Sequence, residues 1–323
     1  MDEGPVVVTG ADGFVGSALV AHFIATGRPF VAVVRRHAAS GAATLRHRAV
    51  GDLATASEAT LGGLVAGAAA IVHLAGRAHV LADAAPDPTA LYHAANVVAT
   101  ERLAAAAVRA GVRRFVFAST IKVHGEASAP GRPFRADDAL APRDAYACSK
   151  SDAERALAAV TAGTPLEAIV LRLPLVYGPH VKGNFLTLLD AVARGALLPF
   201  GMIANRRDLL YVGNLVHAIA ALLDLRDPAG GAWLAADGEP VATPELVRRI
   251  AAALGVAPRV AKVPLPLLAL AARATGRGAL LQRTVASLEV DASPLARRIG
   301  PSPFTLEQGL AATAAWWRLR HAI

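Results

Sequence analysis

The chain has 323 residues, with 33 Lys and Arg against 25 Asp and Glu, so its formal charge is +8. A hydrophobic content of 54% with 18% charged residues suffices for a sizeable core and excludes intrinsic disorder. The basic residues are scattered and aromatic residues make up only 5%, which argues against a nucleic-acid surface and favours small phosphate-bearing partners.

Cysteine content and the N-terminal residues bear on cellular location. Cys148 is the single cysteine, which excludes an intramolecular disulfide and a cysteine-based zinc site and fits a reducing compartment. Asp2 and Glu3 lead directly into an apolar strand, which is not the pattern of a secretory signal. We therefore expect a cytoplasmic protein without a metal site.

The longest apolar runs, residues 66–74 and 264–272, are shorter than the ~20 residues that span a bilayer. We expect no transmembrane segment. The second run contains Pro264 and Pro266, and it could line a pocket, lie in a dimer contact or touch a membrane surface. Burial is the simplest expectation for it.

The first half of the chain alternates apolar, β-branched runs with helical segments. The expected strands are residues 6–8, 30–34, 70–74, 115–118 and 168–173, and the expected helices are residues 16–26, 91–110 and 147–161. Strands without polar alternation, separated by helices, are typical of a parallel sheet covered on both faces. The sequence predicts an α/β fold with a Rossmann-type doubly wound parallel sheet, whose ligand crevice lies at the carboxyl ends of the strands.

A glycine-rich loop follows the first strand. Gly10, Gly13 and Gly16 have G-x-x-G-x-x-G spacing, which allows a tight turn, close approach of a diphosphate and close packing of helix on strand. Phe14 and Val15 then form the helix N-terminus, whose positive end binds phosphate. The loop indicates a dinucleotide site; the alternative is a purely structural turn.

The end of the second strand bears on the choice of cofactor. An acidic residue there would bind the adenosine ribose of NAD, but the sequence has Arg35 and Arg36. Arg35 can neutralise a 2′-phosphate, or both arginines can be solvated loop residues. Asp52 and Leu53 could hold the adenine edge, although Asp52 could also cap a turn. We expect NAD, with NADP as the alternative that Arg35 allows.

A second constellation combines hydroxyl groups with a lysine. Tyr146 and Lys150 are four residues apart on one face of a helix, where the ammonium can lower the pKa of the phenol from about 10. Ser119 and Thr120 end a strand at the carboxyl edge of the sheet, where one hydroxyl can bind a substrate oxygen while Tyr146 exchanges a proton. The alternatives are a half-buried tyrosine beside a surface lysine and capping of the strand end.

After residue 173 the pattern loosens into Pro- and Gly-rich connections, and residues 208–224 return to a strand followed by a helix. Residues 233–323 are rich in helix. We predict a dinucleotide-binding domain of residues 1–172 plus about 205–228, and a smaller C-terminal substrate-binding lobe of residues 173–204 plus 229–323.

Over nearly its whole length the chain resembles the extended short-chain dehydrogenase/reductase family, in its NAD-dependent epimerase/dehydratase branch. Besides the glycine loop and the Tyr146–Lys150 pair, the resemblance rests on His73-Leu74-Ala75-Gly76, Asn96, residues 119–126 and residues 172–179. Aligning Val123-His124-Gly125 with the family's Val-Tyr-Gly places Thr120, rather than Ser119, at the catalytic hydroxyl position.

The resemblance also implies ligands. Leu74, Ala75, Gly76 and Pro174 would line the cofactor site together with Tyr146 and Lys150. Asn96, Lys122, Asn184 and Arg207 would contact a UDP-sugar, with Arg207 on its diphosphate. Arg207 could instead form a salt bridge with Asp208, and Asn184 could be a turn residue beside Gly183. The family further implies a homodimer.

One departure from the family narrows the chemistry. Sugar 4,6-dehydratases carry an Asp-Glu pair directly after the catalytic hydroxyl residue, where this sequence has Ile121 and Lys122. Without these carboxylates the C5 proton and the C6 hydroxyl have no acid/base group, which argues against a dehydratase. The leading hypothesis is a 4-epimerase of a UDP-hexose or UDP-N-acetylhexosamine that passes through a 4-keto intermediate. The alternatives are an NADPH-dependent reductase of a UDP-4-keto-6-deoxy sugar and a non-catalytic dinucleotide sensor.

Overall fold

The computed structural model describes residues 4–36, 47–78, 87–227, 229–276 and 278–321. The chain forms two compact units. The first comprises Met1–His124, Ala139–Leu173 and Val216–Trp233, and the second comprises Gly125–Asp138, Pro174–Leu215 and Leu234–Ile323.

The unit boundaries differ from the predicted domains at three places, the shortest of which is residues 229–233, assigned to the first unit. Residues 125–138 belong to the second unit because Phe134 forms a β-bridge with Val290 there. Residues 205–215 also belong to it, since Arg207 forms bridges with Val241 and Leu288. Both segments are fixed by pairing with residues far along the chain, which composition does not reveal.

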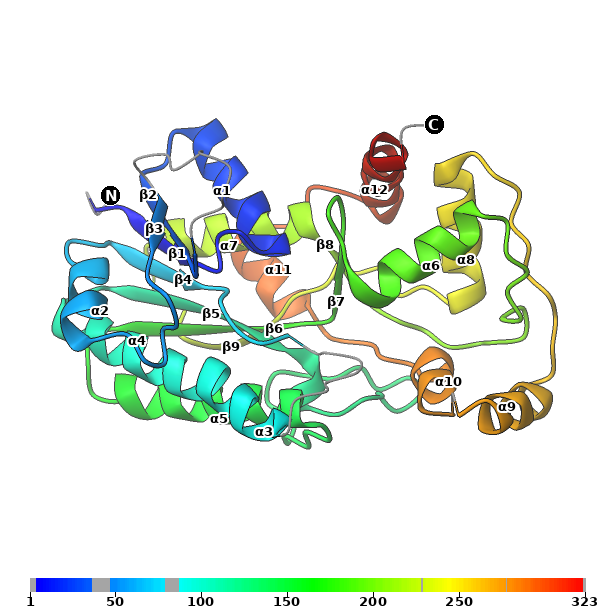
Figure 1. Cartoon of the computed structure of the whole chain (residues 1–323), viewed down its shortest axis with the longest axis horizontal. Helices are drawn as coiled ribbons and strands as arrows, with labels where there is room; N and C mark the ends of the chain where they lie inside the picture. Colours follow the sequence, from blue (N-terminus) through cyan, green and yellow to red (C-terminus); the bar gives the residue numbers. More distant parts are fainter. Residues whose placement is uncertain (1–3, 37–46, 79–86, 228, 277, 322–323) are drawn as a thin grey trace. The chain divides into compact units, whose positions relative to one another are not determined.

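The first unit is built on a seven-stranded sheet with the order β3-β2-β1-β4-β5-β6-β9 (Figure 1). Strands β1 to β6 pair in parallel. Their bounds are β1 Val6–Thr9, β2 Phe30–Val34, β3 His47–Ala49, β4 Ala70–His73, β5 Arg114–Thr120, β6 Glu167–Leu173 and β9 Gly231–Leu234. This order confirms the predicted Rossmann-type sheet, whose direction of winding reverses between β1 and β4.

Helices cover both faces of this sheet. Figure 1 shows α1 and α7 on one face, with α4 and α5 on the other. Their bounds are α1 Phe14–Thr26, α2 Glu58–Val65, α3 Pro88–Tyr92, the π-helical turn η1 His93–Val98, α4 Ala99–Arg109, the 3-10 turn η2 Ile121–Val123, α5 Ala145–Thr161 and α7 Val212–Asp224. All four residues of β1 are buried, as expected for a strand covered on both sides.

The five predicted strands and three predicted helices of the first unit are confirmed, with shifts of a few residues at their ends. The strands β3 and β9 and the helix α2 were not predicted from the sequence. β3 has only three residues, none of them buried, so it produces no apolar run. α2 contains Gly62 and Gly63, which lower its intrinsic helix propensity.

The second unit contains a two-stranded parallel sheet, in which β7 Leu175–Tyr177 pairs with β8 Leu209–Tyr211. The other elements are α6 Gly183–Ala193, α8 Thr243–Leu254, α9 Leu265–Ala274, α10 Gly278–Val285, α11 Ser293–Ile299 and α12 Leu306–His321. The Tyr177 ring is buried and stacks on Phe185 at 5.2 Å between centroids. Among the described residues, no helix has the length and apolar character needed to span a bilayer.

Candidate active site

The glycine loop joins β1 to α1 by a close approach of backbone. Gly10 has φ +66°, and a Cβ on it would lie 2.8 Å from the amide nitrogen of Ala75. A Cβ on Gly16 would overlap the carbonyl oxygen of Gly10. The helix is capped by Gly13, which has no side chain to bind the first N–H groups. These groups are therefore suited to a ligand phosphate, and the loop fits the diphosphate of a dinucleotide.

The adenosine end of the predicted site lies in the loops after β2 and β3. Arg35 and Arg36 are exposed directly after β2. Asp52 accepts the N–H of Ala54 at 2.9 Å, so its carboxylate caps a turn as the alternative interpretation stated. Leu53 is buried. No acidic side chain follows β2 at the position typical of NAD-binding folds.

His73, at the carboxyl end of β4, links three elements without carrying a charge. Its Nδ1 lies 2.7 Å from the hydroxyl of Thr9, and its Nε2 lies 3.1 Å from the hydroxyl of Thr100. Because Thr100 donates its proton to the carbonyl of Asn96 at 2.6 Å, it accepts from the His73 Nε2–H. Complete burial, aided by the nearby Lys150 charge, lowers the pKa of His73 to about 3. The ring is therefore a neutral tautomer that fixes β1 and β4 to the helix beside them.

Asn96, a predicted substrate contact, lies in η1 and is 1% exposed. Its Oδ1 accepts the N–H of Arg77 at 2.8 Å, and its Nδ2 donates to the Arg77 carbonyl at 3.1 Å and to the Ser149 hydroxyl at 2.8 Å. Asn96 thereby holds the loop after β4 against α5, and its contact with substrate stays a prediction.

Ser119 and Thr120 point to opposite sides of β5, as successive residues of a strand do. Ser119 donates to the carboxylate of Glu154 in a buried network. Thr120 instead hydrogen-bonds the phenol of Tyr146. Strand geometry therefore places Thr120, and not Ser119, beside Tyr146, as the alignment with the family's Val-Tyr-Gly implies.

Glu154, which the sequence analysis missed, is the centre of this buried network. Arg172 on β6 donates to both of its carboxylate oxygens, with a shortest distance of 2.7 Å from Nη2 to Oε2. Both side chains are 8% exposed. Arg172 Nη1 also lies 2.9 Å from Nε2 of His124. Glu154 is four residues after Lys150 on α5, and that spacing was the only sign of it in the sequence.

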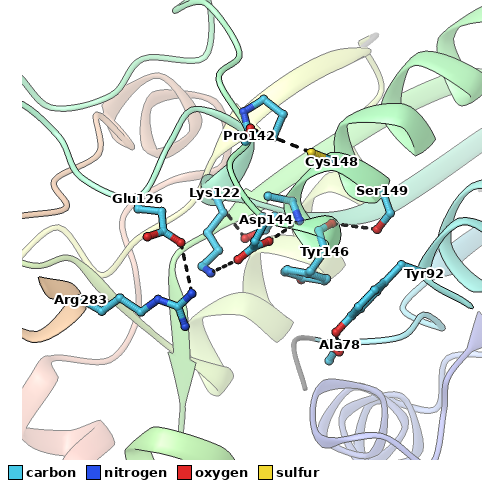
Figure 2. Close-up of polar contacts among 12 residues, drawn as sticks. Ala78, Tyr92, Lys122, Glu126, Pro142, Asp144, Tyr146, Cys148, Ser149 and Arg283 are labelled. Atoms are coloured by element: carbon cyan, nitrogen blue, oxygen red, sulfur yellow. Dashed lines mark hydrogen bonds and ion pairs between the residues drawn. The ribbon is translucent and has the colours of Figure 1, made fainter. Parts of the chain in front are cut away.

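Tyr146 lies in the first turn of α5, whose N-terminus is capped by Asp144 through a 2.7 Å bond from the Ala147 N–H. Its ring is 6.1 Å from that of Tyr92, at an interplanar angle of 58° (Figure 2). Burial raises the pKa of Tyr146 to about 12, Asp144 and Tyr92 act in the same direction, and the hydrogen bond with Thr120 lowers it. In this state the phenol keeps its proton at neutral pH.

Lys150 is buried one turn further along α5. Its ammonium donates to the carbonyl of Ala118 at 2.8 Å and lies 4.5 Å from the centroid of the Phe117 ring. Burial lowers its pKa to about 8, and the charge of Glu154 opposes that shift. A Cβ on Gly76 would lie 2.7 Å from Oδ1 of Asn96 and 3.5 Å from Nζ, so a side chain at that position would clash with Asn96 beside the lysine.

Lys122 forms a salt bridge rather than a free contact point. Figure 2 shows its ammonium directed at the carboxylate of Asp144, with Nζ 2.7 Å from Oδ2. The two side chains are 22% and 20% exposed. Asp144 is two residues before Tyr146, and its pair with Lys122 holds η2 against the start of α5. No carboxylate occupies positions 121 and 122, where the dehydratase chemistry needs its acid/base pair.

The second unit contains an arginine without an acidic partner. Arg207 donates through Nη1 to the carbonyls of Arg283 and Ala286, both at 2.8 Å, and no described acidic side chain forms an ion pair with it. Burial lowers its pKa. Asp208 bonds the N–H of Val290 instead, so the salt-bridge alternative between Arg207 and Asp208 is wrong. Such a guanidinium is suited to an anionic ligand.

Three further positions of the second unit bear on the site. Asn184 is exposed in the first turn of α6, and Pro174 is buried where this unit begins. Arg283, which the sequence analysis missed, lies on α10 and pairs with Glu126 at 3.4 Å (Figure 2). It stands in no recognisable motif, and only the tertiary structure brings its backbone to Arg207.

The strand order, the glycine loop and the Tyr146–Lys150 helix together define an enzyme of the extended short-chain dehydrogenase/reductase class. Residues 6–235 match the model of the NAD dependent epimerase/dehydratase family. The chain belongs to this family, and NAD is the cofactor of the family's chemistry.

Relatives support a sugar-nucleotide branch of the family. The chain is 36% identical to a UDP-glucose 4-epimerase from Vibrio cholerae over 311 residues, which are 96% of this chain and 94% of that protein. It is 34% identical to a 2-alkyl-3-oxoalkanoate reductase from Stenotrophomonas maltophilia, over 80% of this chain and 77% of the reductase. The solved structure of MoeE5 in complex with UDP-glucose and NAD is similar, with a TM-score of 0.79, 30% identity, and coverage of 98% of this chain and all of MoeE5.

Proposed function

We propose that the protein is an NAD-dependent 4-epimerase of a UDP-hexose or UDP-N-acetylhexosamine. The observation that carries this proposal is the Thr120–Tyr146 hydrogen bond beside a buried Lys150, in a chain that has Ile121 and Lys122 where a dehydratase has two acids. The similarity to the Vibrio cholerae 4-epimerase over nearly the full length of both chains supports the same activity.

Tyr146 is the proton-transfer group in this proposal. Its phenolate removes the proton of the C4 hydroxyl, and the Thr120 hydroxyl donates a hydrogen bond to the C4 oxygen. When bound, NAD supplies the two-electron acceptor that oxidises C4 and afterwards returns the electrons. Tyr146 then returns the proton to the C4 oxygen of the keto sugar, which has turned its other face to the cofactor.

The pKa of about 12 for Tyr146 explains why the cofactor matters to the base. A phenol with that pKa is almost wholly protonated at neutral pH. Lys150 and the positive charge of an oxidised nicotinamide both favour the phenolate. We infer that the base forms only after cofactor binding, when these charges lie near the phenol.

Arg207 supports a substrate with a diphosphate. Its guanidinium is held by two carbonyl groups, which orient it without neutralising its charge. A diphosphate would supply the missing negative charge through bidentate hydrogen bonds. We propose that Arg283 and Asn184 also contact the diphosphate, as weaker polar contacts.

A reductase of a UDP-4-keto-6-deoxy sugar is the second candidate. It would use the same three residues, with Tyr146 as the proton donor, and the protonated phenol suits that role. The observation in its favour is Arg35, which is exposed at the end of β2 where no acid would repel the 2′-phosphate of NADPH.

Cofactor release followed by turnover distinguishes these candidates. The purified protein is denatured, and the released nucleotide is identified by mass and absorbance. An epimerase retains NAD and interconverts UDP-sugars without added cofactor. A protein that carries no nucleotide and consumes NADPH only with a 4-keto sugar contradicts the epimerase proposal.

Replacing Tyr146 by Phe tests the assigned chemistry. We expect kcat to fall by roughly 10²–10⁴-fold, the range of general acid–base catalysis, with cofactor binding retained. Cys148→Ser, an exposed position on the same helix, is the control. Normal turnover by Tyr146→Phe would contradict the assignment, and normal function without any turnover would support the dinucleotide sensor.

A further inference from the structure

Helix α9 is an apolar helix without a buried residue. Leu265, Leu267 and Leu270 are 43%, 58% and 67% exposed, and no residue of the helix is buried. The expectation that residues 264–272 are buried is therefore wrong within the described chain. Exposed leucines concentrated on one short helix mark an interaction surface more often than scattered ones do.

The helix lies in a basic environment. Residues 246–288 contain no Asp or Glu. Arg259, Lys262 and Arg273 are exposed on or just before α9, and none of them forms an ion pair with a described acidic side chain. The charged residues on α9 and in the segment just before it are therefore all cations.

The segment just before α9 pairs with residues 198–201 of the same unit. The N–H of Leu198 donates to the Arg259 carbonyl at 2.8 Å, and the N–H of Gly201 donates to the Ala261 carbonyl at 2.9 Å. Leu197 and Met202, which flank this pairing, are 62% and 50% exposed. The residues after this pairing lead directly into α9, which lies beside α10 in Figure 1.

We propose that α9 docks on an anionic phospholipid bilayer, with Leu267 and Leu270, three residues apart on one face of the helix, in the acyl boundary and with Lys262 and Arg273 against the headgroups. At ten residues the helix is about 15 Å long, which is too short to cross a bilayer but suited to lying on it. Anionic headgroups complement the cations. A second copy of this chain would instead bring the same cations together across a symmetric interface, where they would repel.

Vesicle flotation of the whole protein tests this surface. Vesicles of phosphatidylcholine alone are compared with vesicles that also contain phosphatidylglycerol. We expect binding to the mixed vesicles only, weakened by salt. The double variant Leu267→Ser/Leu270→Ser should weaken it at least tenfold, because each leucine loses its apolar burial. Lys262→Gln/Arg273→Gln should weaken it roughly tenfold or more, because each cation near an anionic surface contributes measurably.

Ile24→Ser/Leu319→Ser is the matched control, because these two apolar residues are 61% and 82% exposed on other helices. It should bind vesicles like the wild type. The proposal is overturned if the wild type does not bind the mixed vesicles, or if the control loses as much binding as the α9 variant. It is also overturned if light scattering shows a dimer that only the α9 leucine variant dissociates, since α9 would then be a contact between copies.

Discussion

Arg172 and Arg207 are both arginines withdrawn from solvent, but they are neutralised differently. Arg172 makes three hydrogen bonds with the carboxylate of Glu154, so its charge is balanced within the first unit. Arg207 is held only by carbonyl groups, so its charge remains for another anion. A buried arginine with a carboxylate partner is part of the structure, whereas one held by neutral groups alone is a candidate ligand site.

The largest effect that this comparison predicts is on stability. Glu154→Gln leaves Arg172 buried without a carboxylate, and we expect the free energy of unfolding to fall by about 3–5 kcal/mol. Urea denaturation measures it. The control is Asp152→Asn on the same helix, whose pair with Arg155 is exposed and should contribute under about 1 kcal/mol. Equal losses in the two variants would show that Glu154 and Arg172 are not a special pair.

Arg207→Gln should show the converse behaviour. We expect KM for the UDP-sugar to rise roughly 10–100-fold, because hydrogen bonds to a charged group contribute about 1.5–3 kcal/mol, while stability falls less than in Glu154→Gln. Steady-state kinetics measures KM. Arg206→Gln is the neighbouring control, since Arg206 is exposed and paired with Glu289. If Arg206→Gln raises KM as much as Arg207→Gln does, the assignment of Arg207 as a specific substrate ligand is wrong.

His73 is a third buried polar group, and its hydrogen bonds are made while its ring is neutral. Its folded pKa of about 3 is below its ordinary value of 6.5, so its contribution to stability is complete above pH 6.5 and is lost as pH falls toward 3. Between pH 6.5 and about pH 5, the wild type should lose about 2 kcal/mol more than His73→Asn. Urea denaturation across this range measures the difference. Parallel pH profiles would mean that His73 is charged in the folded protein.

Much of the first unit could be predicted from the sequence. The apolar runs and the glycine spacing indicated the sheet and its cofactor loop, because parallel strands and phosphate loops depend on local residue patterns. The Tyr146–Lys150 spacing likewise predicted two side chains on one face of α5. The absence of acids at positions 121 and 122 was already visible and argued against a dehydratase.

Other assignments depended on where side chains point. Ser119 and Thr120 are equivalent as neighbours in the sequence, and only the pleat of β5 sends one to Glu154 and the other to Tyr146. The sequence likewise does not show that the Asn96 amide bonds the backbone of Arg77 and the Ser149 hydroxyl, because these residues are distant along the chain.

The sequence by itself determined the class of fold, the glycine loop and the placing of Tyr146 and Lys150 on one helix, because each follows from periodicity or spacing within one or two elements. The tertiary structure alone decided which charges are balanced. Glu154 and Arg172 are 18 residues apart in the sequence. Arg207 contacts the carbonyls of Arg283 and Ala286, which are 76 and 79 positions further along the chain. It also decided that the leucines of α9 are exposed, because burial depends on which elements pack together and not on how apolar a segment is.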